Sequence, residues 1–311
     1  MPWERRYSRP KRLPWEKSVT FCVAMLCDKS KSLILGADKM LGIGVIETEP
    51  EITKILDLHK NWKVLFAGEV TPVSDIVDRA RLTLAGEPAP NLDAVITAIQ
   101  ASYEKKRQND ADDMYLTPRG WTHREFIDKG NSLLPDTLYA DIEDKLAKYE
   151  LEIQLIVAGF DSSGIGHIFC VDSEVRRGIP QRCDISGFCA IGGGAIGGSY
   201  MMHFRKCSPQ MRVREALYYC LEAKWFGEHA GSVGLRTDVV ILRHGKKPIP
   251  LDDEETVEKK FLSGMCERLS PRELLTKKNV GILNSLAELD GKGIEKLEVP
   301  KKKKRKTTVN P

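Results

Sequence analysis

A run of apolar, β-forming segments between Ser18 and Ala80 constrains the fold of this chain more than any other feature. VTFCVAML and LILGAD flank the charged turn Asp28–Ser32, and this pattern predicts two buried strands joined by a turn. Two further segments, ITKILDL and WKVLFAG, follow at short spacing, and SDIVDRARLTL then predicts a helix capped by Ser74. The region therefore predicts four strands followed by a helix.

Polar or small residues stand at the edges of these four segments. Thr20 opens the first, Asp38 closes the second, Lys54 interrupts the third and Gly68 ends the fourth. A hydroxyl, a carboxylate, a lysine and a glycine amide are the groups that an activated nucleophile and an oxyanion site require. The alternative is structural: Thr20 would be an ordinary strand residue, and Asp38 and Lys54 would form an ion pair that fixes strand ends.

The rest of the chain groups its strands and helices. Residues 74–107 predict two helices, the second capped by Asn91, and the polar, turn-rich residues 109–149 predict an insertion with one short helix. A strand hairpin (LEIQLIVAGFDSSGIGHIFCVD), two helices (in CAIGGGAIGGSYMMHF and RVREALYYCLEAKWFGEHA) and a strand (TDVVILRHGK) follow. This order indicates an α+β fold, and two stacked sheets between two helical layers fit it.

Positive charge is concentrated at the two ends of the 311-residue chain. Residues 1–17 are net +4 and Lys301–Lys306 carries six positive charges, so with a formal total of +4 the intervening residues 18–300 are net −6. Because nucleic-acid binding requires a basic folded face, we expect at most a weak contact through the lysine-rich tail. Residues 1–19 are interpreted as an arm or propeptide, and residues 251–311 as a helical extension with that tail.

Several classes of site and location are excluded by composition. No apolar run reaches the roughly 18 residues of a membrane span, so a cytoplasmic protein that does not contact membranes is expected. The eight cysteines form no CxxC pair and have no histidine at metal spacing, so reduced, buried thiols and no metal site are predicted. Gly192–Gly194 lacks the lysine of a P-loop, so close strand–helix packing is expected there, and no cofactor.

The segments TFCVAML, LILGAD, ITKIL, VLFAGEVTPVSDIV, LIVAGFD, AIGGGAIGG and TDVVILRHG resemble the proteasome-type N-terminal-nucleophile (Ntn) hydrolases. The resemblance runs from Val19 to about Gly245 and is to the core of 20S proteasome β-subunits. It implies a four-layer αββα sandwich over residues 20–250, with the insertion at about 109–149. It also implies assembly of identical copies into a ring or stacked rings.

The resemblance assigns roles to individual residues. Thr20 would be the nucleophile once residues 1–19 are removed, and Lys54 would lower the pKa of its hydroxyl. Asp38 would orient Lys54, and the Gly68 amide would donate to the oxyanion. An apolar specificity pocket would be lined by Leu41, Ile52, Phe66 and Val70. The implied activity is threonine-type hydrolysis of peptide or other amide bonds, without a cofactor.

Two of the positions that differ from the family's pattern favour a second interpretation. Val19 stands where self-processing members have glycine, and a β-branched residue disfavours the backbone conformations that glycine permits. Gly193 stands where the family has a serine near the nucleophile. A non-catalytic subunit of the same fold, as in the α-type subunits of proteasome rings, would account for both differences.

Overall fold

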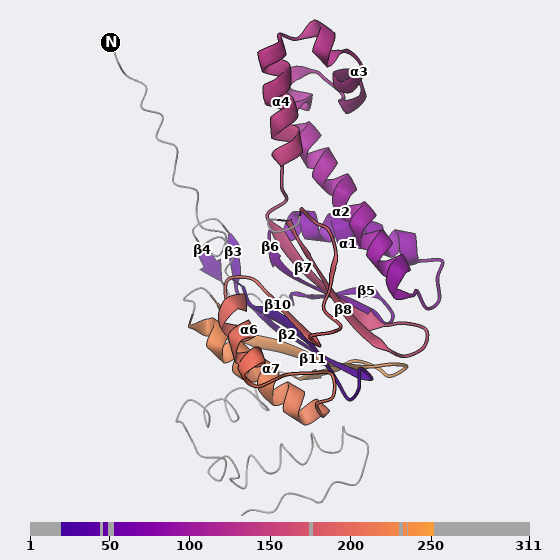
Figure 1. The fold of residues 1–311 in the computed structure, drawn as a ribbon, viewed down its shortest axis with the longest axis vertical. Helices are drawn as coiled ribbons and strands as arrows, with labels where there is room; N and C mark the ends of the chain where they lie inside the picture. Colours follow the sequence, from indigo (N-terminus) through magenta and orange to yellow (C-terminus); the bar gives the residue numbers. More distant parts are fainter. Residues whose placement is uncertain are drawn as a thin grey trace, which may run out of the picture.

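The computed structural model describes residues 20–43, 46–48, 53–173, 177–229, 233–234 and 236–251. Within these ranges the chain is a mixed α+β protein with two five-stranded antiparallel sheets, a short two-stranded sheet and six α-helices. Figure 1 shows the two large sheets stacked at the centre of the molecule. The arm at residues 1–19, Ile52 and residues 252–311 of the predicted C-terminal extension, with its lysine-rich tail, lie outside the described residues.

The first sheet has the strand order β10-β1-β2-β11-β12. Its strands are β1 (Cys22–Cys27), β2 (Ser32–Asp38), β10 (Phe188–Ile191), β11 (Thr237–Arg243) and β12 (Ile249–Leu251). β1 and β2 form the predicted hairpin, with Cys22 opposite Ala37, and every residue of both strands is buried. The turn between them is tight, since Asp28, Lys29 and Ser30 all have positive φ.

The second sheet has the order β5-β6-β7-β8-β9. Its strands are β5 (Ile55–His59), β6 (Trp62–Gly68), β7 (Ile153–Phe160), β8 (Gly166–Asp172) and β9 (Gln181–Arg182). The predicted hairpin of β7 and β8 is confirmed. A small hairpin of β3 (Leu41–Ile43) and β4 (Ile46–Thr48), which the sequence did not predict, separates β2 from β5.

Two helix pairs cover the sheets, one pair on each side of the stack (Figure 1). They are α1 (Val70–Leu84) with α2 (Leu92–Tyr115), and α6 (Ala195–Phe204) with α7 (Val213–Glu228). The predicted Ser74 cap is wrong, because α1 begins at Val70 after Glu69. The Asn91 cap is confirmed, since its side chain accepts a hydrogen bond of 2.8 Å from the Ala94 amide.

Three apolar clusters explain why polar and apolar residues do not alternate along the central strands. Val23 and Met25 of β1 pack in a cluster with side chains of α6 and α7, whereas Cys22 and Ala24 pack in a cluster shared by the two sheets. A third cluster joins the second sheet to α1 and α2. Strands buried on both faces require continuous apolar runs, and this is the pattern that the sequence carries around Thr20.

The insertion is a helical protrusion that continues from α2. It contains the 3₁₀ turn Thr117–Arg119 and the helices α3 (His123–Leu133) and α4 (Asp136–Lys148), which Figure 1 shows projecting away from the sheets. It has two helices, where the sequence predicted one. It has its own small core of Leu116, Phe126 and Ile142. None of the described helices has both the length and the apolar composition that crossing a membrane requires.

Candidate active site

Three polar side chains from separate elements meet in the interior. Lys54 Nζ donates hydrogen bonds to Thr20 Oγ1 at 2.7 Å and to Asp38 Oδ1 at 2.9 Å. Thr20 lies two residues before the start of β1, Asp38 ends β2 and Lys54 directly precedes β5. The exposed fractions of the three residues are 5%, 0% and 1%, respectively. The structure therefore brings together three of the four residues that the sequence singled out as catalytic.

Asp38 is held in place by four donors. Its Oδ1 accepts from the Phe21 amide at 2.8 Å as well as from Lys54. Its Oδ2 accepts from the amides of Met40 at 3.2 Å and Gly234 at 3.0 Å. A buried carboxylate is tolerated when its oxygens are hydrogen-bonded and a cation lies beside it. The sequence did not identify Gly234, which lies 196 residues along the chain from Asp38 and has no local signal.

Lys54 is the cation of this site, and its position has a chemical consequence. An ammonium group carries three donors and no acceptor, so it can contact Thr20 Oγ1 only as a donor. A buried positive charge 2.7 Å from a hydroxyl oxygen stabilises the negative charge that the oxygen gains when it loses its proton. The arrangement can therefore activate Thr20, provided that a base accepts the hydroxyl proton.

Gly68 lies at the end of β6 with a φ of +100°, a conformation that side chains rarely adopt. A Cβ atom at this position would lie 2.4 Å from the carbonyl oxygen of Glu152, so only glycine fits. The end of β6 adjoins the start of β1, because Cys22 Sγ donates to the carbonyl oxygen of Phe66 at 3.3 Å. This contact lies two residues after Thr20 in the sequence and two residues before Gly68.

The glycine-rich turn closes over the backbone of Thr20. The Gly194 amide donates to the Thr20 carbonyl oxygen at 3.3 Å, and a Cβ atom on Gly192 would lie 2.2 Å from that oxygen. The Gly192 amide donates to Gln154 Oε1 at 2.8 Å, which ties the turn to β7. The predicted close strand–helix packing is confirmed at Gly194, where a Cβ atom would lie 3.0 Å from the carbonyl oxygen of Gly227 in α7. The contact of the turn with Thr20 is one that the spacing of the glycines could not reveal.

No contact among the described residues brings together the four residues that were predicted to line a specificity pocket. Phe66 is 2% exposed and packs in the cluster that faces α1 and α2. Val70 is 43% exposed at the first position of α1. Leu41 lies in β3, and Ile52 lies outside the described residues. Their role in substrate binding stays a prediction.

Cys22 is the rival nucleophile closest to Thr20 in sequence. Burial raises the pKa of its thiol well above the usual range, and the nearby Lys54 charge only partly offsets this. The thiol also donates to a backbone carbonyl. Because the thiolate is the reactive form, these features make Cys22 a packing residue.

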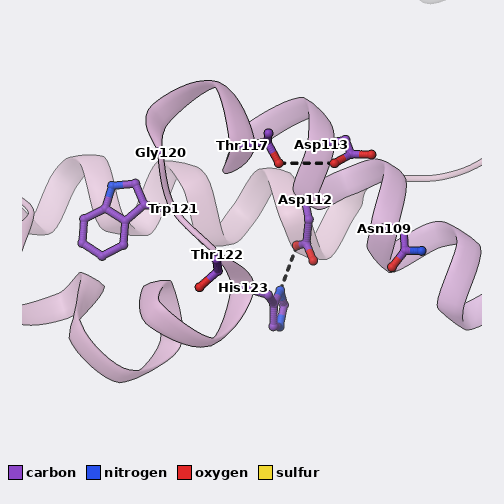
Figure 2. Close-up of a pocket in the computed structure, with 8 residues that line it drawn as sticks. All are labelled: Asn109, Asp112, Asp113, Thr117, Gly120, Trp121, Thr122 and His123. Atoms are coloured by element: carbon purple, nitrogen blue, oxygen red, sulfur yellow. Dashed lines mark hydrogen bonds and ion pairs between the residues drawn. The ribbon is translucent and has the colours of Figure 1, made fainter.

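An open pocket of about 510 Å³ lies in the insertion, away from these residues. Figure 2 shows His123 directed at Asp112, with Nδ1 and Oδ1 2.8 Å apart, and Thr117 beside Asp113. Trp121 points away from this group. The contacts join the end of α2 to the start of α3, where Thr122 forms a capping box, so we assign them a structural role.

Among the described residues, one group has the arrangement of metal ligands: Cys170, Cys183 and Cys189. The sequence predicted no metal site, because these cysteines are separated by 12 and 5 residues and lack a CxxC pair. Only the fold brings them together. Comparison with models of known protein families and with curated proteins finds no match to this chain.

Proposed function

We propose that this chain is a proteasome-like Ntn hydrolase subunit that cleaves peptide or other amide bonds through Thr20. The contact of Lys54 Nζ with both Thr20 Oγ1 and Asp38 Oδ1, inside the core, is the observation that carries the proposal. The helix pairs on both sides of the two sheets support the finer fold assignment, a four-layer αββα sandwich.

The proposed reaction begins with removal of residues 1–19, which converts the Thr20 amide into a primary amine. This amine accepts the Oγ1 proton while Lys54 stabilises the oxygen, which attacks the substrate carbonyl carbon. The negative charge on the carbonyl oxygen is stabilised by the Gly68 amide. The C–N bond then breaks, the leaving amine takes the proton, and an ester on Thr20 remains until water hydrolyses it.

The test uses protein whose residues 1–19 have been removed by a site-specific protease, so that Thr20 is the first residue. We expect hydrolysis of fluorogenic peptides with an apolar residue before the cleaved bond, no activity in Thr20→Ala, and substantial activity in Thr20→Ser. Intact mass of the untagged full chain shows whether it processes itself. Peptidase activity that persists undiminished in Thr20→Ala contradicts the proposed mechanism.

Assembly into a ring or stacked rings is part of the same proposal. Ile196, Tyr200 and Phe204 recur every four residues along α6 and are 56%, 74% and 80% exposed. A helical stripe of large exposed apolar side chains is typical of a protein–protein contact. Light scattering of the wild-type protein and of Tyr200→Glu tests whether this face joins copies of the chain.

A second candidate, a non-catalytic subunit of such a ring, is favoured by the burial of Thr20. In the uncleaved chain Thr20 is 5% exposed and has an amide nitrogen in place of the required amine. The same Lys54–Asp38 pair then serves only to fix the ends of two strands. Detection of a free Thr20 amine by N-terminal sequencing of the purified protein would argue against this candidate.

A further inference from the structure

Three cysteines that are separate in sequence hold their sulfur atoms within 4.8 Å of one another. Cys170 lies in β8, Cys183 directly follows β9 and Cys189 lies in β10. β9 is the edge strand of one large sheet, and β10 is the edge strand of the other. The three thiols therefore lie where the chain crosses from one sheet to the other.

The backbone around each thiol is fixed by hydrogen bonds. Cys170 pairs within the sheet on both sides, and Cys189 pairs with β1. The Cys183 amide donates to the Ile168 carbonyl oxygen at 2.8 Å, and its own carbonyl oxygen accepts from the Gly187 amide at 2.9 Å. Such anchoring fixes the backbone that carries the three thiols before any ligand binds, so only side-chain rotation is needed to complete a metal site.

The separation of the sulfur atoms suits a metal ion with little rearrangement. A metal–sulfur bond of about 2.3 Å places two thiolates of one ion about 3.8–4.0 Å apart. Sulfur atoms that lie up to 4.8 Å apart therefore need to approach one another by less than about 1 Å to bind one ion, and side-chain rotation allows this movement. Cys170 and Cys183 are partly exposed while Cys189 is 9% exposed, so an ion can enter from one side of an otherwise apolar interface.

The ligand set decides the class of ion. Thiolates select soft ions such as Cu(I) and Zn(II) over Mg²⁺, Ca²⁺ and Mn²⁺, which prefer oxygen. No histidine, aspartate or glutamate in the part of the chain that the structure describes joins the trio. Three sulfur ligands complete the trigonal coordination of Cu(I), whereas Zn(II) would add water or a small external ligand as a fourth.

We propose that Cys170, Cys183 and Cys189 bind one thiophilic d¹⁰ ion, Cu(I) or Zn(II), as three thiolates. Binding forms three metal–sulfur bonds and releases three thiol protons to solvent, with no change in oxidation state. The bound ion crosslinks the edges of the two sheets. The site shares no residue with Thr20, Asp38 and Lys54, so it goes beyond the proposed hydrolase function and is independent of it.

The experiment titrates the full chain, stripped of metal and kept reduced without air, with Zn(II) and separately with Cu(I) against a chromophoric chelator. We expect one equivalent of one of these ions to bind, and X-ray absorption to show three sulfur atoms at about 2.3 Å. Cys170→Ser and Cys183→Ser should each lower the affinity by more than about 100-fold, the upper end of the effect of losing an outer-shell partner. The ion that binds with the higher affinity is the one that the site prefers, Zn(II) or Cu(I).

Cys207→Ser is the matched control, because Cys207 is 8% exposed, like Cys189, but packs in the cluster of α6 and α7. Its affinity should equal that of the wild type. A second readout needs no variant: the bound ion should slow alkylation of Cys170 and Cys183 in the wild-type protein, as mapped by mass spectrometry. Absence of stoichiometric binding, equal affinity in all three variants, or alkylation unaffected by the ion would each overturn the proposal.

Discussion

Replacing Lys54 with methionine removes the cation from the buried cluster of Thr20, Asp38 and Lys54 while keeping most of the side-chain volume. Asp38, which is fully buried, would keep its three backbone donors but lose its counter-charge. Removing one partner of a buried ion pair destabilises proteins by about 3–5 kcal/mol. With an m value of about 3 kcal/mol/M, this corresponds to a decrease of about 1–1.7 M in the urea midpoint.

Urea unfolding followed by tryptophan fluorescence measures this effect, since Trp62 is fully buried. The double variant Lys54→Met/Asp38→Asn should be more stable than the sum of the single effects predicts, by about 0.5–3 kcal/mol, because neither charge is then left alone. Lys63→Met is the control: Lys63 pairs with Asp57, which is 74% exposed, so its loss should change stability by less than about 1 kcal/mol. If Lys54→Met lowers the free energy of unfolding by no more than Lys63→Met does, the reasoning about the buried cluster of Thr20, Asp38 and Lys54 is refuted.

Three further predictions concern the backbone, a titrating group and a helix cap. Gly68→Ala should lower stability by at least about 1–3 kcal/mol in thermal unfolding, since its φ is positive and a Cβ atom meets backbone, whereas Gly86→Ala meets nothing and should be tolerated. The Asp184 carboxylate, 3.1 Å away, raises the pKa of His167 above 6.5 despite partial burial, so this contact stabilises the fold fully below about pH 6.5 and is lost as pH rises through the folded-state pKa. Urea midpoints of His167→Gln should therefore decline less with rising pH than those of the wild type, and an equal decline would contradict this. Asn91→Ala should destabilise the protein by about 1 kcal/mol in urea unfolding, and no change would show that the cap is dispensable.

The elements that the sequence predicted are those with strong local signals. The hairpin of β1 and β2 follows from two apolar runs around a charged turn, and Asn91 precedes an obvious helix. Thr20, Asp38 and Lys54 were also identified, because each is a polar group at the edge of an apolar segment. The local pattern was sufficient to single out these three residues, and their catalytic role stays a prediction.

The features that the sequence did not reveal depend on contacts between distant segments. Nothing near Gly234 indicates that its amide binds Asp38, and no spacing rule brings Cys170 together with Cys189. The Ser74 cap was wrong for a related reason. α1 begins at Val70, with only one residue between it and the end of β6, so the short connection between strand and helix decides where the first turn begins.

The root of the insertion is tied where it leaves the main body. Arg107 of α2 donates to the carbonyl oxygens of Leu146 and Tyr149, at 3.5 and 3.3 Å, so the outgoing and returning segments are clamped together. Beyond this clamp the small core of Leu116, Phe126 and Ile142 shares no residue with the other three clusters. The tip should therefore open as a separate cooperative unit, with its amide protons exchanging faster than those of β1 and β2.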